Sequence, residues 1–177
     1  MPTVFTCESG WEAALADELR RTWLKPGREI DAQASAAGRV VANVPPDAAN
    51  ADPIVAFASQ VLPDAEPCAA ASISQWADAA CERISARLDQ LSVPWRLHVV
   101  ATPFADGSTG AGRAKLVRDA LVAKLREVRR RLLRRMNDAS EGPWLPDEAL
   151  VQVLLTSPGE GFISVAEVDR RHAWRHV

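Results

Sequence analysis

The stretch Arg113–Met136, RAKLVRDALVAKLREVRRRLLRRM, carries the strongest indication of the fold. Its apolar residues recur at steps of four and three, at Val117, Leu121, Leu125, Val128 and Leu132. This spacing draws one apolar stripe along an α-helix, and such a stripe must pack on a sheet or on another helix. The sequence therefore predicts one long helix that belongs to a layered α/β domain.

The same stretch is strongly basic. It contains ten of the 21 lysines and arginines of the chain and only two of the 23 acidic residues, a charge of +8. Because the whole chain carries −2, the remaining residues carry −10, and the near-neutral total conceals a dipolar molecule. A basic helix of this kind indicates a polyanion as the first partner to consider.

Two interpretations of this charge stay open. Many of the cations lie one helical turn apart, where like charges repel, and arginine outnumbers lysine eight to two. Guanidinium groups match phosphates with paired hydrogen bonds, which favours nucleic acid. Alternatively, the stretch is a solvated helix face that Asp119, Glu127 and the acidic remainder of the chain compensate. The residues predicted to bind RNA phosphates are Arg113, Lys115, Arg118, Lys124, Arg126, Arg129, Arg130 and Arg134.

Length and composition are those of a folded protein with one medium domain or two small ones. The chain has 177 residues, of which 47% are apolar and 25% charged. It has no apolar run near the roughly 20 residues that span a bilayer and no signal segment, so a cytoplasmic location away from membranes is expected. The three cysteines are scattered, which favours neither a disulfide framework nor a zinc site.

The N-terminal residues, 1–63, predict a ferredoxin-like β-α-β-β-α-β unit. The spacing of Ser9 and Glu12 is that of a helix capping box, and it precedes a helix that Pro26-Gly27 would end. The inner positions expected on that helix are Trp11, Leu15, Leu19 and Trp23. The other expected elements are strands at 4–6, 29–35, 39–44 and 61–62 and a helix at Pro53–Gln60.

The C-terminal residues, 67–177, predict a second α/β domain with one sheet. A strand at 68–73, a helix at about 75–91 and a strand at Trp95–Ala101 lead through a glycine-rich loop into the basic helix. Two further strands, 150–155 and 161–168, flank Ser157-Pro-Gly-Glu160, which has the residues of a hairpin turn.

Four stretches, read in order, carry a family resemblance. They are FTCESGWE from Phe5, DPIVAFASQ from Asp52, the strand, loop and helix of Trp95–Leu125, and LVQVLLTSPGEGFISV from Leu150. In this order they resemble the ferredoxin-like unit and THUMP domain of RlmM-type (FtsJ-like) large-subunit rRNA cytidine 2′-O-methyltransferases. The fold class expected is therefore α+β, a ferredoxin-like unit followed by a THUMP-like α/β domain.

The resemblance implies an RNA-binding module that presents structured rRNA to a methyltransferase domain, joined in cis or supplied in trans. That separate domain would hold S-adenosylmethionine, and no residues of this chain match its cofactor loop or its catalytic set. The chain is therefore expected to be non-catalytic and to hold no cofactor itself. The alternative is a protein-interaction scaffold whose basic helix docks on an acidic partner.

Three smaller features remain as candidate sites. The loop FADGSTGAGR, Phe104–Arg113, precedes a helix and could hold a phosphate, although it matches no P-loop and a plain flexible loop is the simpler interpretation. Trp144 and Trp174 are candidates for base stacking because they are expected to be exposed. His172 and His176 lie four apart but lack the rest of a metal motif, so no metal site is predicted.

Overall fold

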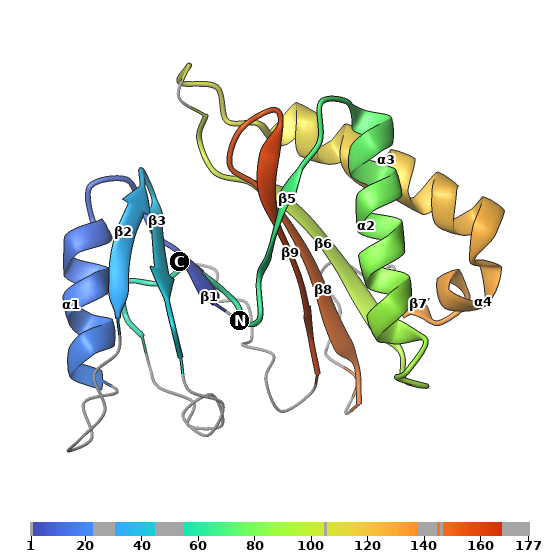
Figure 1. Ribbon diagram of the computed structural model, residues 1–177, viewed down its shortest axis with the longest axis horizontal. Helices are drawn as coiled ribbons and strands as arrows, with labels where there is room; N and C mark the ends of the chain where they lie inside the picture. The colour runs from blue at the N-terminus through green and yellow to red at the C-terminus, as the bar shows by residue number, and fades with distance from the viewer. Residues whose placement is uncertain are drawn as a thin grey trace. The chain divides into compact units, whose positions relative to one another are not determined.

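The computed structural model describes residues 2–22, 31–44, 55–104, 106–137, 145 and 147–167. These residues form two compact units, one within Met1–Ala65 and one within Glu66–Val168 (Figure 1). The predicted end of the second domain at 177, together with Trp23, Trp144, Trp174, His172 and His176, lies outside the described residues.

The first unit has the strands and the first helix of the predicted ferredoxin-like unit. Its elements are β1 (Thr3–Thr6), α1 (Glu12–Thr22), β2 (Ala32–Ala36), β3 (Arg39–Ala42) and β4 (Gln60–Leu62). The strands form a wholly antiparallel sheet in the order β2-β3-β1-β4. Leu15 and Leu19 of α1 are fully buried and pack with Phe5 of the central strand. Apolar residues four apart place both leucines on one face of the helix.

Three local predictions in this unit were wrong. The helix expected at Pro53–Gln60 is absent from its described part, where 55–59 form bends and β4 begins at Gln60. Tertiary contacts fix those bends, because the Glu18 carboxylate accepts hydrogen bonds from the backbone N–H groups of Ala56 (2.7 Å) and Phe57 (3.1 Å). Trp11 precedes the helix and is 47% exposed, so it lies outside the core.

The start of α1 also differs from the expected capping box. The helix begins at Glu12, three residues after Ser9, and the carboxylate of Glu12 accepts hydrogen bonds from the backbone N–H groups of Gly10 and Gly38. Glu12 therefore ties the first turn of α1 to the turn between β2 and β3. These hydrogen bonds, that of Gly38 first, lower the pKa of Glu12.

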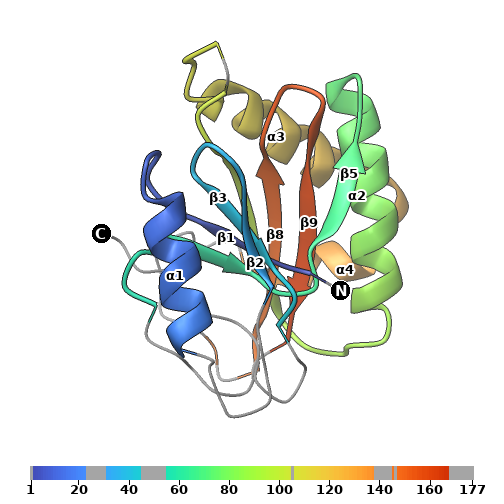
Figure 2. The same ribbon diagram turned by 60° about the vertical axis from the view of Figure 1, so that its left-hand side comes forward.

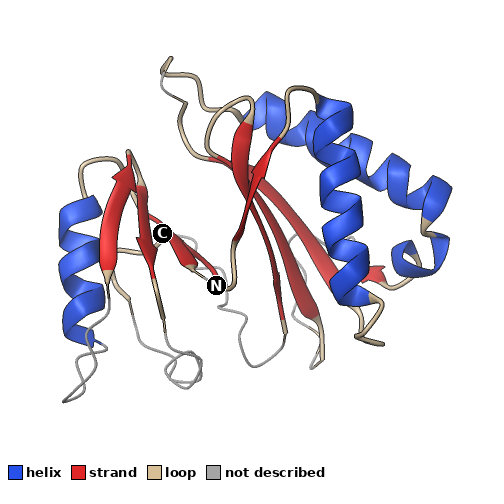
Figure 3. Cartoon of the chain, in the orientation of Figure 1, coloured by secondary structure: helices blue, strands red, loops and turns tan. Residues whose placement is uncertain are grey.

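The second unit is a sheet with helices on one face. Its elements are β5 (Glu66–Ala69), α2 (Ile73–Leu88), β6 (Trp95–Ala101), α3 (Ala111–Val128), α4 (Arg130–Leu133), β7 (Met136–Asn137), β8 (Ala149–Leu155) and β9 (Glu160–Ala166). The strand order is β5-β9-β8-β6-β7, in which β6 runs parallel to β7 and β8, and β9 is antiparallel to β5 and β8. Figures 2 and 3 show α2 and α3 covering the same side of this sheet.

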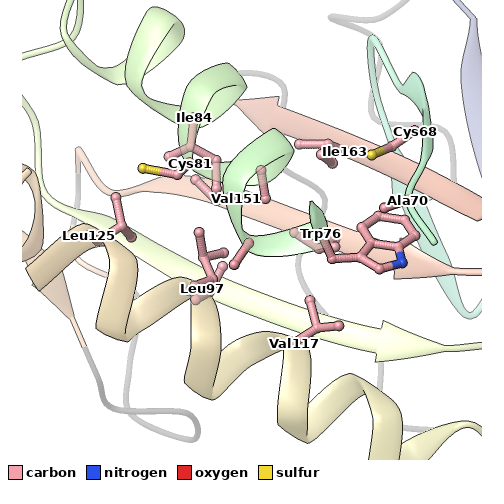
Figure 4. Close-up of a cluster of buried hydrophobic side chains, with 14 of the residues drawn as sticks. Cys68, Ala70, Trp76, Cys81, Ile84, Leu97, Val117, Leu125, Val151 and Ile163 are labelled. Carbon is pink, nitrogen blue, oxygen red and sulfur yellow. The ribbon is translucent and has the colours of Figure 1, made fainter. Parts of the chain in front are cut away.

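The core of the second unit lies between these helices and the sheet. Trp76 and Ile84 of α2, Val117 of α3 and Val151 of β8 are each 0% exposed (Figure 4). The hairpin of β8 and β9 and the strand β6 agree with prediction to within about two residues, because their alternating or continuous apolar runs admit no other register.

Candidate nucleic-acid interface

Helix α3 is held on the sheet by the apolar stripe that its sequence predicted. Val117, Leu121 and Leu125 are all 0% exposed and pack in the core between α2 and β6. The fourth expected position, Val128, is 47% exposed, because it lies at the last residue of α3. The polar residues of α3 are therefore held on the faces that turn away from the core.

The basic stretch is two helices rather than the single helix that was predicted. Helix α3 ends at Val128, and Arg129 adopts a non-helical backbone with φ −140° and ψ 47°. The four-residue helix α4 follows and folds back towards β7 (Figure 1). This break returns Leu132, which is 2% exposed, to the core. The burial of Leu132 thus outweighs the preference of the local sequence for a continuous helix.

Three of the predicted RNA-binding residues contact neighbouring protein groups, although Arg129 stays exposed. The Nζ of Lys124 lies 2.8 Å from the Oδ1 of Asp78 on α2, and this hydrogen bond raises the pKa of Lys124. The Nε of Arg129 donates to the hydroxyl of Ser85 on α2 at 3.3 Å. Arg118 lies 4.0 Å from Asp119. Asp78 and Asp119 thus compensate part of the charge of Lys124 and Arg118, whereas the partner of Arg129 is neutral.

Two more predicted residues lie at the beginning of α3. Arg113 is half-buried and Lys115 is exposed. Lys115 precedes Arg126 by 11 positions, which is about 16 Å along a helix axis. The structure therefore does not bring these two residues together with the cations at the end of the helix.

Four exposed arginines between positions 126 and 134 are here called the arginine cluster. It consists of Arg126 at the end of α3 and Arg130, Arg131 and Arg134 in and just after α4. All four residues are exposed, and the Nε of Arg130 donates to the carbonyl oxygen of Arg126 at 3.2 Å. Arg131 was not among the residues predicted to bind RNA. The sequence predicted one continuous helix, whereas the break at Arg129 leaves Arg131 exposed.

The glycine-rich loop before α3 is shaped by packing. Gly110 caps the helix with φ 65°, and a Cβ atom on it would lie 2.6 Å from the Cβ of Ala101 and from the Cζ of Phe104. Asp106 in the same loop accepts a hydrogen bond from the Ser108 N–H at 2.9 Å, which lowers the pKa of its carboxyl group. The negative charge of Asp106 opposes the binding of an anion in this loop. The phosphate site expected there is untested and stays a prediction.

An aromatic pair that the sequence reading missed lies in the first unit. The rings of Trp11 and Phe57 stack with centroids 5.1 Å apart and planes inclined by 23°. Both are partly exposed, at 47% and 39%. The sequence placed Trp11 on the inner face of its helix, and the structure differs because α1 begins one residue later, at Glu12.

Other chemistry finds little support within the described residues. No group of three or more histidine, cysteine, aspartate and glutamate side chains is placed to hold a metal ion in this part of the chain. Burial raises the pKa of Cys7 to about 11, which makes its thiol a poor nucleophile. No described helix is long and apolar enough to cross a membrane.

The chain resembles several solved structures, among them two that are described as methylases. A predicted N6-adenine-specific DNA methylase from Listeria monocytogenes is 18% identical with a TM-score of 0.57, and the match covers 94% of this chain and 40% of that protein. A possible methylase from Clostridium difficile is 14% identical with a TM-score of 0.56, covering 93% and 40%. TrmN from Thermus thermophilus is 16% identical with a TM-score of 0.51, covering 96% and 47%.

At these identities the likeness shows the fold alone. It supports the THUMP-like region expected from the sequence and gives no support to the RlmM type in particular. This chain spans less than half the length of each of these three structures. No protein-family model and no curated protein sequence matches it.

Proposed function

We propose that this chain is a non-catalytic RNA-binding module that presents structured RNA to an S-adenosylmethionine-dependent methyltransferase domain. The observation that carries the proposal is the arginine cluster: four exposed guanidinium groups at the end of α3 and in α4. Guanidinium groups bind phosphate oxygens in pairs, and a cluster of them suits the backbone of a folded RNA better than a single base.

The methyl-transfer part of the proposal rests on the fold. The chain matches only a part of proteins that are described as methylases, so the chemistry would belong to a domain outside the matched region. Large-subunit rRNA as the target, a cytoplasmic location and the absence of a cofactor from this chain are parts of the same proposal. The resemblance in sequence supports the rRNA target and a cofactor held by a separate domain, and the location stays an expectation.

The proposal is tested by binding of a fluorescently labelled structured rRNA fragment, followed by anisotropy over a series of salt concentrations. The test variant is Arg130→Gln/Arg134→Gln, which removes two charges from the arginine cluster. The matched control is Arg21→Gln/Arg87→Gln, which removes the same charge from exposed arginines of α1 and α2. Circular dichroism confirms that each variant is folded.

The expected result is a steep loss of affinity with salt for the parent and the control. The test variant should bind more weakly, and the slope of log affinity against log salt should be shallower by about two. If the control weakens binding as much as the test variant, the contact is diffuse and the arginine cluster is not the site. If the parent binds no RNA at low salt, the alternative of a scaffold for an acidic protein gains support.

A further inference from the structure

The four-residue helix α4 carries much of the arginine cluster, but a helix this short is not stable by itself. A helix of one turn lacks the hydrogen bonds that offset the cost of nucleation. Arg130 and Arg134 lie one turn apart, where like charges destabilise a helix further. The geometry of the cluster must therefore come from contacts between this turn and the rest of the unit.

The first such contact comes from Trp95, the first residue of β6. Its side chain is 0% exposed, and its indole N–H donates to the carbonyl oxygen of Leu132 at 2.9 Å. Its backbone N–H donates to the carbonyl oxygen of Arg135 at 3.1 Å. Trp95 also stands opposite Met136 where β6 and β7 pair. One residue of the sheet thus binds both α4 and the chain that leaves it.

The second contact comes from Arg135, whose guanidinium group turns inward. Its Nη2 donates to the carbonyl oxygen of Leu88 at 3.0 Å, and its Nη1 donates to those of Leu91 and Val93. These carbonyl groups lie at the C-terminus of α2 and in the turn after it, where a cation is favoured by the helix dipole. Arg135 ties the end of α4 to α2 and to the turn after it through both of its terminal nitrogens.

We propose that Trp95 and Arg135 are positioning residues for RNA, and that Arg131 joins the surface that they hold in place. This inference rests on the proposed function of the arginine cluster. The ligand is the RNA backbone, whose phosphate oxygens the exposed guanidinium groups of α4 would bind together. Holding the turn rigid before binding removes the ordering cost that flexible arginines would otherwise impose on the complex.

The deciding variant is Trp95→Phe, which changes no charge and leaves the arginine cluster chemically intact. The matched control is Trp76→Phe, because Trp76 is also 0% exposed, lies in the same core and donates its indole N–H to a backbone carbonyl oxygen, that of Pro158, at 3.3 Å. Trp76 belongs to α2 and makes its bond to the β8–β9 turn, far along the chain from α4. Anisotropy with the rRNA fragment and urea unfolding are measured for both.

Trp95→Phe should weaken RNA binding by about tenfold and lower the salt slope by about one to two, because phosphate contacts are lost together. Trp76→Phe should lose comparable stability but keep the affinity and slope of the parent. Equal affinities for the two variants, whether both are parent-like or both reduced, would overturn the inference while leaving the proposed function standing. A parent that binds no RNA overturns both.

A second pair of variants separates positioning from direct contact and does not depend on Trp95→Phe folding. Arg135→Lys keeps the charge, but a single ammonium group cannot reproduce a fork that reaches three carbonyl groups. We expect Arg135→Lys to weaken RNA binding as Trp95→Phe does. If Arg135 instead contacted phosphate directly, the lysine would preserve the slope of log affinity against log salt, and that result would contradict the inference. Arg131→Gln should lower the slope by about one, and an unchanged slope would remove Arg131 from the surface.

Discussion

Gly110 shows how strongly one residue controls the start of α3. Its φ of 65° is unfavourable for any residue with a Cβ atom, and that atom would come within 2.6 Å of both Ala101 and Phe104. The loop expected from sequence to be flexible or to hold phosphate therefore has a packing requirement at Gly110. Gly112, only two residues later, has open space around it.

We predict that Gly110→Ala destabilises the second unit by about 2–4 kcal/mol, from backbone strain and overpacking together. Gly112→Ala, the matched control inside the helix, should be neutral or stabilising by up to about 1 kcal/mol because glycine is a poor helix former. Urea unfolding of both variants measures the difference. Equal stabilities would show that the loop adjusts to accept the new methyl group.

Glu12 gives the first unit a defined dependence on pH. Hydrogen bonds from the backbone N–H groups of Gly38 and Gly10 lower its pKa in the folded state. Because this pKa is lowered on folding, the Glu12 carboxylate stabilises the fold fully at any pH above its pKa in the unfolded chain. That stabilisation is lost as the pH falls through its pKa in the folded protein. Stability from this group therefore falls on acidification.

We predict that Glu12→Gln is less stable than the parent at neutral pH and that the gap closes on acidification, as the carboxylate of the parent becomes protonated. Urea midpoints measured from pH 7 down to about pH 3 test this, since an unperturbed glutamate titrates near about 4.3. Glu8→Gln, which removes a carboxylate from the same loop, is the control. A gap that stays constant over this range would argue against a role for the Glu12 charge.

Helix α3 illustrates which features of an element can be deduced from spacing. The steps of four in Val117, Leu121 and Leu125 place these side chains on the buried face, as predicted. Leu116 also lies in the helix but off this stripe, and it is 58% exposed. The pattern of apolar residues thus sorts two leucines of one helix into the core and the solvent.

The two leucines give a matched test of that pattern. Leu121→Ala should destabilise the second unit by about 2–5 kcal/mol, because it leaves a cavity in a packed core. Leu116→Ala should change stability by less than about 0.5 kcal/mol, as an exposed substitution does. Urea unfolding compares them directly, and similar losses for both would mean that α3 is packed on another face than the one described.

The distribution of charge over the whole chain leads to a further expectation. The protein carries a net charge of −2 at pH 7 and has a pI of about 5.9, so its average charge opposes binding to a polyanion. Concentrating +8 within Arg113–Met136 creates a local potential of the opposite sign. The net charge therefore predicts that the protein passes through a negatively charged matrix, whereas the basic stretch predicts that it is retained.

We predict that the protein is retained on immobilised heparin at pH 7 and low salt despite its net negative charge. The variant Arg126→Gln/Arg130→Gln/Arg131→Gln/Arg134→Gln should elute at markedly lower salt, because attraction to a polyanion grows with the number of cations that contact it. The elution conductivity measures this. Passage of the parent through the column without retention would show that compensation by acidic residues dominates.

Much of the architecture follows from local patterns of apolar residues. The strands of the ferredoxin-like unit, the single sheet of the second unit, the β8–β9 hairpin and the buried stripe of α3 were all predicted, since periodicity and turn residues specify which faces are buried. The basic character of Arg113–Met136 was equally plain, because charge is a property of composition that folding redistributes but does not remove.

Contacts between segments that are distant in the sequence determine which basic side chains are exposed. The break at Arg129, the inward turn of Arg135 and the pairing of Lys124 with Asp78 each depend on residues of α2 or β6 that lie more than 30 positions away in the chain. Burial of Leu132 and the hydrogen bonds of Trp95 outweigh local helical preference there. Periodicity describes one helix at a time, whereas these contacts arise from packing between elements.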